Sequence, residues 1–134
     1  MGKIQQQVGK SFEDEILEYY YKRCYFTYKF PTANTGTVFD IIAMRGNHSI
    51  NIEAKHTTSD KLYYKGSGLF KKKYELDNFC SRGNDLFIYI KSDKLNGYYW
   101  ITWNIAKIIF EEKGYLDIEK DCKKFWLNKD EDNN

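Results

Sequence analysis

The sequence predicts an α/β fold in which a central mixed β-sheet is flanked by helices. Two kinds of apolar pattern alternate along its 134 residues: segments with helical periodicity, and shorter segments rich in β-branched and aromatic residues. Turn residues separate these segments, and the resulting order is helix, three strands, helix, two strands, helix. Because both kinds of element recur along the chain, we expect them to form layers around one sheet.

Length and composition are typical of one well-packed domain. The chain is 42% hydrophobic and 18% aromatic and contains a single proline, which excludes a fibrous or a largely disordered chain. We expect one domain over residues 1–129 and an acidic, disordered tail over residues 130–134.

Net charge bears on possible nucleic-acid partners, and cysteine content bears on the cellular compartment. The net charge is only +2, so a general attraction to nucleic acid would be weak, but six lysines lie between residues 55 and 73 against one acid, Asp60. The three cysteines are far apart and match neither a zinc spacing nor a disulfide framework. With no signal-peptide pattern and no membrane-spanning apolar run, we expect an intracellular, cytoplasmic protein; a phage-encoded protein acting in its host fits equally.

The first predicted element is a helix over Gln6–Lys22. Its apolar residues form one continuous arc, and Asp14, Glu15 and Glu18 fall on the opposite arc. Glu13 is the exception, because it falls inside the apolar arc. A carboxylate on a buried face is costly unless it is paired or binds a metal, so Glu13 is a candidate third metal ligand.

A strand over Cys24–Phe30 and a hairpin follow. The arms of the hairpin are Val38–Arg45 and Ser49–Thr57, joined by the two-residue turn Gly46-Asn47. Every second residue from Phe39 to Ala43 is apolar, as is every second residue from Ile50 to Ala54. We expect these apolar positions to share the face that packs on helices.

The second half of the chain repeats the alternation of helices and strands. Residues 58–68 are polar and rich in glycine, which predicts a mobile loop. The remaining predictions are a helix over Leu69–Ser81, strands over Leu86–Ser92 and Tyr98–Trp103, a helix over Ile105–Lys113, and a docking patch at residues 125–127 near the end of the chain.

The hairpin carries the candidate site. A two-residue turn sets Asp40 directly opposite Glu53, where Cβ atoms are about 4.5 to 5.5 Å apart. Two ionised carboxylates at that distance repel unless a cation lies between them. Lys55 shares the face of Glu53, and the carbonyl of Ala54 is a further candidate ligand. This set predicts a Mg²⁺ site for phosphodiester hydrolysis, in which Lys55 either orients water or stabilises negative charge.

Two less specific interpretations compete with the metal site. Glu-x-Lys is common on exposed strands, and a lysine run is commonly a solvated face. The combination favours a functional site, because Asp40 interrupts an apolar strand opposite Glu53 and Glu13 interrupts an apolar helix face. Lysines interleaved with aromatic residues also suit nucleic-acid binding, and the candidates are Lys61, Tyr63, Lys65, Lys71, Lys72 and Lys73.

Three segments together resemble the PD-(D/E)xK nuclease superfamily: Gly9 to Glu13, Val38 to Ala43, and Ile52 to Lys55. The closest likeness is to Holliday-junction resolvases of the archaeal and Gram-positive RecU-like type, and residues 29–33 look like the segment before the metal aspartate in the Gram-positive branch. One departure is that no glutamine lies between Lys71 and Asn78, where family members often carry one.

The resemblance implies a restriction-endonuclease-like core and a homodimer that cuts four-way DNA junctions. Glu13, Asp40 and Glu53 would be the metal ligands and Lys55 the catalytic lysine, with Mg²⁺ as the metal and Mn²⁺ as a plausible substitute. Further expected DNA contacts are Lys10, Lys29, Thr32 and Thr35. The alternatives are a restriction, repair or replication nuclease of the same superfamily, and a non-catalytic nucleic-acid-binding module.

Overall fold

A six-stranded mixed sheet forms the centre of the molecule. The computed structural model describes residues 11–31, 38–125 and 127. Among the described residues, neighbouring strands follow the order β1-β2-β3-β5-β6-β8, and β3 and β5 are the only pair that runs parallel. The bounds are β1 (Phe26–Lys29), β2 (Ile41–Arg45), β3 (His48–Thr57), β5 (Phe87–Ser92), β6 (Gly97–Thr102) and β8 (Lys123–Phe125). The predicted α/β fold with a mixed sheet is therefore confirmed.

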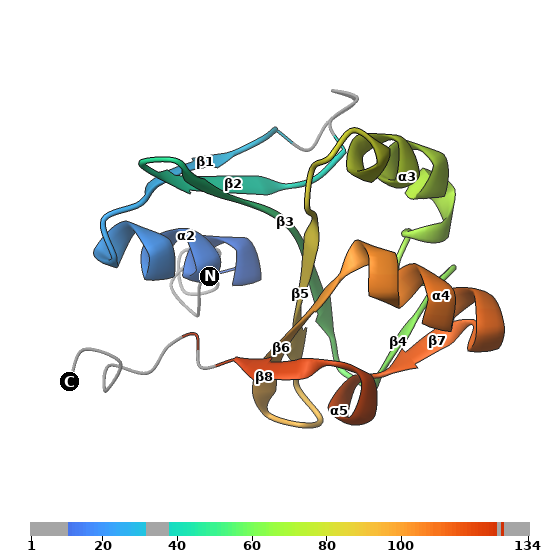
Figure 1. The fold of residues 1–134 in the computed structure, drawn as a ribbon. Coiled ribbons are helices and arrows are strands. Elements are labelled where there is room, and N and C mark those ends of the chain that lie inside the picture. The colour runs from blue at the N-terminus through green and yellow to red at the C-terminus, as the bar shows by residue number, and fades with distance from the viewer. Residues whose placement is uncertain (1–10, 32–37, 126, 128–134) are drawn as a thin grey trace.

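Helices cover both faces of this sheet (Figure 1). Helix α2 (Phe12–Lys22) packs against β1, β2 and β3 on one face. On the other face lie α3 (Lys73–Ser81), which follows the 3₁₀ turn η1 (Phe70–Lys72), and α4 (Trp103–Lys113), which contacts both α3 and β6. No helix of the described residues is long and apolar enough to cross a membrane.

The core is divided by the sheet into two clusters, because successive strand residues point to opposite faces. Ile41 and Ile52 are buried in the cluster beneath α2. Ile88 and Ile90 belong to the cluster beneath α3 and α4. Phe39 packs against this second cluster, so the prediction that it shares a face with Ile41 is wrong. The alternation fails there because β2 begins only at Ile41, and residues 38–40 are bent.

Capping explains where the first elements begin. The Ser11 hydroxyl accepts a hydrogen bond from the Asp14 N–H at 3.1 Å, so α2 begins at Phe12 and not at Gln6; residues 6–10 lie outside the described residues. After α2, Cys24 has a φ of +68°, and the strand predicted from Cys24 begins at Phe26. A left-handed residue cannot continue a strand, which shortens the element.

The hairpin forms in the predicted register. Gly46 has a φ of +61°, which suits the first central position of a two-residue hairpin turn. Arg45 pairs with His48, and Ile41 pairs with Ile52. The side chains on either side of Ile52 must therefore lie on the face away from α2, which is the face that carries the functional groups.

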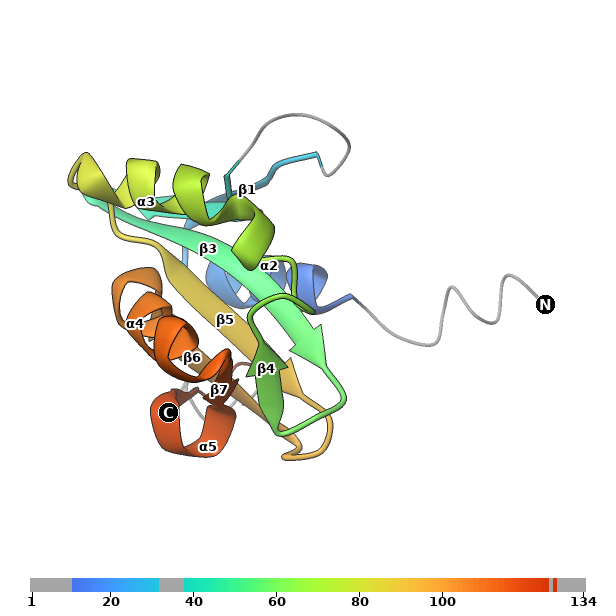
Figure 2. The same cartoon turned by 90° about the vertical axis from the view of Figure 1, so that its right-hand side faces the viewer.

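Three short strands lie outside the predicted pattern: β8 at the edge of the main sheet, and two strands that form a small second sheet. The segment predicted as a mobile loop contains β4 (Lys61–Tyr63), which pairs antiparallel with β7 (Tyr115–Asp117) in a small second sheet next to α4 (Figure 2). Leu62 is the buried residue of β4 and belongs to the cluster beneath α4. The loop prediction was wrong because a single buried side chain and a distant partner strand order this polar segment.

The end of the chain is also more regular than predicted. A single turn of helix, α5 (Ile118–Asp121), joins β7 to β8. Leu127 is buried in the cluster beneath α2 and Phe125 packs against that cluster, as expected of a patch that docks the end of the chain; Trp126 is outside the described residues. The predicted acidic tail, residues 130–134, also lies outside them.

Candidate functional site

Asp40 is held at the point where the chain enters β2. Its carbonyl accepts a hydrogen bond from the Phe30 N–H at 2.8 Å, and its own N–H donates to the Ile52 carbonyl at 3.0 Å. Its carboxylate oxygen Oδ2 accepts a hydrogen bond from the Ala54 N–H at 2.9 Å. The neighbouring strands β1 and β3 thus position both the backbone and the side chain of Asp40.

Glu53 lies in the middle of β3 and is only 1% exposed. Its Oε2 atom is 2.8 Å from Lys72 Nζ and 3.4 Å from Lys55 Nζ. Its Oε1 atom is buried and has no hydrogen-bond partner among the described residues. One oxygen of this carboxylate therefore binds two ammonium groups, and the other is left unsatisfied.

The electrostatics of Glu53 reflect this incomplete pairing. Burial raises the pKa of Glu53 above its usual value, and the nearby Asp40 carboxylate raises it further. Lys72 and Lys55 lower the pKa without cancelling the rise. A divalent cation would satisfy both the free oxygen and the repulsion from Asp40, so these residues fit the Mg²⁺ chemistry expected from the sequence.

Lys55 is fixed by the segment that follows β3. Its ammonium donates a hydrogen bond to the Ser67 carbonyl at 2.7 Å. The next residue, Gly68, has a φ of +86°, a conformation that favours glycine, so the turn that presents the Ser67 carbonyl depends on a glycine at this position. With one contact to the loop and one to Glu53, Lys55 is held beside the carboxylate pair.

Lys72 also belongs to the site, whereas the sequence predicted it to be one of the surface lysines that contact DNA. It lies at the junction of η1 and α3, and its ammonium forms the shortest ion pair to Glu53. One sequence signal could have found it, because Lys72 precedes the fully buried Leu76 by four residues. Residues four apart share a helix face, so the side chain of Lys72 is directed toward the sheet.

Glu13 does not join this cluster. Helix α2 packs on the opposite face of the sheet, and Glu13 pairs with Lys29 at 3.2 Å. The side chain of Glu13 is 23% exposed, and that of Glu15, which was predicted to point to solvent, is 21% exposed and pairs with Lys91 at 3.2 Å. The predicted contrast between these two glutamates is therefore wrong, since the Lys91 side chain of β5 covers Glu15.

A cage of three or more His, Cys, Asp or Glu side chains that could hold a metal is absent from the described ranges. The structure does bring together four charged residues, Asp40, Glu53, Lys55 and Lys72. One carboxylate pair is compatible with Mg²⁺, because this ion keeps several waters and needs only one or two protein carboxylates.

The expected DNA contacts are distributed unevenly. Lys61 and Tyr63 lie in β4, Lys65 follows it, Lys71 lies in η1, and Lys73 is the first residue of α3. Lys29 is engaged by Glu13, as described above. Lys10, Thr32 and Thr35 lie outside the described residues.

The fold and the site together define a class of protein. A carboxylate pair beside lysines, on the central strands of a mixed sheet with helices on both faces, is the arrangement expected of the PD-(D/E)xK nucleases. The family model described as archaeal Holliday junction resolvase (Hjc) matches residues 4–127, and the chain belongs to this family.

A solved structure agrees with the family match. Hjc, a Holliday junction resolvase from the archaeal hyperthermophile Archaeoglobus fulgidus, superimposes with a TM-score of 0.55, 18% sequence identity and 87% of each chain covered. No curated protein matches the chain. The family is one of metal-dependent nucleases, and the chain is a structure-selective endonuclease of branched DNA.

Proposed function

We propose that this protein cuts the phosphodiester backbone near the branch of a four-way DNA junction, using Mg²⁺ held by Asp40 and Glu53. The observation that carries this proposal is the buried Glu53 carboxylate, whose Oε1 atom lacks a partner among the described residues while Asp40 lies beside it. Mn²⁺ is a plausible substitute, because it prefers the same oxygen ligands.

Each residue of the site has a proposed role. When bound, the ion would act as a Lewis acid that polarises the phosphate and lowers the pKa of the attacking water. Asp40 is oriented for this by the Ala54 N–H, and Lys72 holds Oε2 of Glu53. Lys55 stabilises the negative charge that develops on the phosphate, or orients the water, from its position beside Glu53.

Two ligands predicted from the sequence remain part of the proposal. Glu13 is proposed as a third ligand, and its ion pair with Lys29 has to open for it to reach the carboxylate pair. The carbonyl of Ala54 is proposed as a further ligand, since the neighbouring residues Glu53 and Lys55 already face the site.

DNA is proposed to contact the lysines around β4 and α3. Each lysine that neutralises a phosphate releases bound counterions, so binding should weaken steeply as salt is raised. The proposed contacts are Lys61, Tyr63, Lys65, Lys71 and Lys73, together with Lys10, Lys29, Thr32 and Thr35.

We propose that the working form is a homodimer. A four-way junction is resolved by cutting two opposed strands, and each chain supplies one site built from Asp40, Glu53 and Lys55. Two chains related by a twofold axis would supply two such sites. A cytoplasmic site of action is also proposed, because Cys24, Cys80 and Cys122 are all free thiols.

The test is cleavage of a labelled four-way junction beside a linear duplex and a single strand, with Mg²⁺ and with chelator. We expect paired nicks in the junction only, lost in chelator. Asp40→Asn should bind the junction and leave it uncut. Equal cutting of all three DNAs would remove the junction preference, and no cutting by the folded protein in Mg²⁺ or Mn²⁺ would overturn the proposal.

A further inference from the structure

A hollow lies beside Lys55, and neither Asp40 nor Glu53 lines it. Its volume is about 350 Å³, and its lining includes Lys55, His56, Lys61, Tyr63 and Ser67. We call it the Lys55 hollow. The residues that line it include no carboxylate, so its charge suits a phosphate group of a DNA strand.

A larger hollow begins where the first ends. It has a volume of about 700 Å³, and we call it the aromatic hollow because the rings of Tyr63, Tyr64, Phe70 and Phe110 line it. Tyr63 and Gly66 line both hollows. The two hollows therefore meet at Tyr63, which is 52% exposed.

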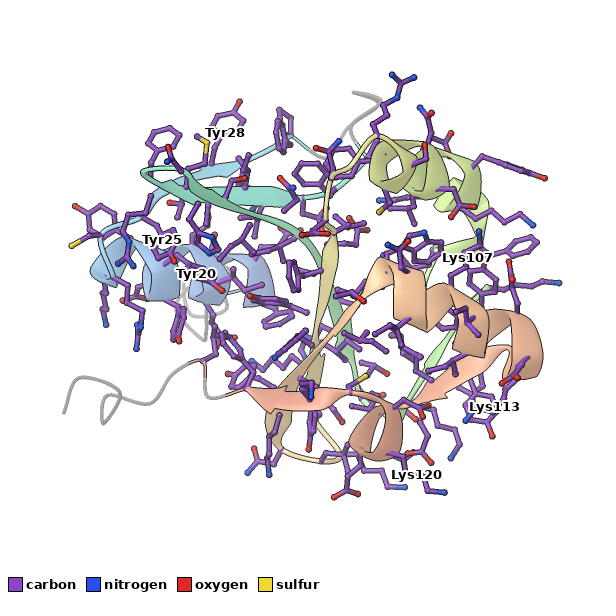
Figure 3. The ribbon with its side chains drawn as sticks, in the orientation of Figure 1. Tyr20, Tyr25, Tyr28, Lys107, Lys113 and Lys120 are labelled. Atoms are coloured by element: carbon purple, nitrogen blue, oxygen red, sulfur yellow. The ribbon has the colours of Figure 1, made fainter. Side chains whose placement is uncertain are left out.

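The rim of the aromatic hollow carries both signs of charge. Lys65 Nζ and Lys73 Nζ lie 5.2 and 4.5 Å from the centre of the Phe70 ring. Lys113 lies at the end of α4, the helix that also carries Lys107 (Figure 3). Glu111 and Glu112 also line this hollow and offset two of its three lysines, so it attracts a phosphate less strongly than the Lys55 hollow, whose lining has no carboxylate.

The interior of the aromatic hollow suits a group that is flat and partly polar. Tyr64 stacks on Phe110, with ring centres 4.6 Å apart, and its buried hydroxyl has no hydrogen-bond partner among the described residues. Tyr63 leaves half of its surface open to a ligand. A nucleobase offers a ring face for stacking, and its amino groups can donate hydrogen bonds to a carboxylate such as that of Glu111.

We propose that the aromatic hollow holds one unpaired nucleotide of the strand that passes Lys55, with its base stacked on Tyr63 and its phosphate in the Lys55 hollow. This inference rests on the proposed function and specifies its substrate. In a continuous duplex both faces of a base are covered by its neighbours, so only an unstacked base can enter. DNA with an unpaired nucleotide next to the cut should therefore be preferred.

The experiment compares binding of two four-way junctions, one fully paired and one with a single unpaired nucleotide at the branch. Fluorescence anisotropy is measured on the full chain in chelator, so that no cutting occurs. We expect the unpaired nucleotide to tighten wild-type binding about tenfold, as stacking of one base does in other proteins. Tyr63→Phe should keep this preference, and Tyr63→Leu, which removes the ring but keeps an apolar side chain, should lose it.

Tyr74→Leu is the matched control, because Tyr74 is 75% exposed on α3 and lies outside both hollows. The inference is overturned if Tyr63→Leu and Tyr74→Leu behave alike, or if Tyr63→Leu changes the sedimentation of the protein, which would mean that a second copy covers the hollow. A wild-type protein that cuts the paired junction but shows no tenfold preference would refute this inference and leave the proposed function intact.

Discussion

Two partly or fully buried carboxylates in this protein, Glu53 and Asp77, behave in opposite ways. Burial and the Asp40 carboxylate raise the pKa of Glu53. The two neighbouring lysines, Lys72 and Lys55, lower the pKa by less than this rise. Burial would also raise the pKa of Asp77, but hydrogen bonds from Lys107 and Trp103 outweigh it and lower the pKa. The difference lies in how completely each group is paired.

Both carboxylate oxygens of Asp77 accept a hydrogen bond. Its Oδ1 atom accepts from Trp103 Nε1 at 2.9 Å, and its Oδ2 atom accepts from Lys107 Nζ at 2.8 Å. Each oxygen has one donor, and the arrangement joins α3 to α4. In Glu53, by contrast, both lysine ammonium groups contact the same carboxylate oxygen, Oε2. A carboxylate with complete partners stabilises the fold, and one with a free oxygen is available for a ligand.

Replacing Glu53 should have the largest effect on cutting. Glu53→Gln keeps the shape of the side chain and removes its charge, so we expect junction cleavage in Mg²⁺ to fall by about a hundredfold or more, since even groups that only support a metal ligand contribute about 10- to 100-fold. The melting temperature in chelator should not fall, because burial and the Asp40 carboxylate disfavour the charge on Glu53 by more than its two lysines favour it. Cleavage rate and thermal melting measured on the same preparation check both parts.

A Glu53→Gln protein that cuts normally would contradict the assignment of Glu53 to the metal site. A protein that loses both cutting and its melting transition would instead place Glu53 with Asp77, among the structural carboxylates.

Removing Lys72 should have an intermediate effect. Lys72→Met deletes the ammonium that holds Oε2 of Glu53, and we expect cleavage to fall by about tenfold, within the range for groups that position a metal ligand. Lys71→Met is the control, because Lys71 lies in the same lysine run and is exposed. Cleavage rates of both variants at saturating Mg²⁺ are the measurement, and equal losses would show that Lys72 acts only as one more surface cation.

The sequence was informative where local chemistry decides the structure. The Gly46-Asn47 turn and the alternation of apolar residues set the register of the hairpin, and the structure pairs Ile41 with Ile52 as that register requires. The association of Asp40 with β3, and of Lys55 with Glu53, follows from the register alone.

The sequence was uninformative where distant segments decide the structure. Strand β4 exists because it pairs with β7, more than 50 residues later in the chain. Lys72 reaches Glu53 only because η1 and α3 fold back over β3. Glu15 is covered by Lys91 of β5, which helix periodicity cannot indicate. Each of these contacts depends on tertiary packing, which overrides local pattern.

Asp77→Asn should have the smallest effect on cutting and a measurable effect on stability. The change weakens the charge-assisted hydrogen bonds from Lys107 and Trp103, and we expect the free energy of unfolding to fall by about 1 kcal/mol, the lower part of the usual range, since Asp77 is one-third exposed.

Because its folded pKa is lowered, the contribution of Asp77 is present above its unfolded pKa of 3.8 and is lost as the pH falls through the folded value. Denaturant unfolding at pH 7 and at pH 3 should therefore show a larger difference between variant and wild type at pH 7 than at pH 3. Junction cleavage at pH 7 should stay within about twofold of wild type, and a larger loss would mean that α3 transmits the change to Lys72, so that the two carboxylates are not independent.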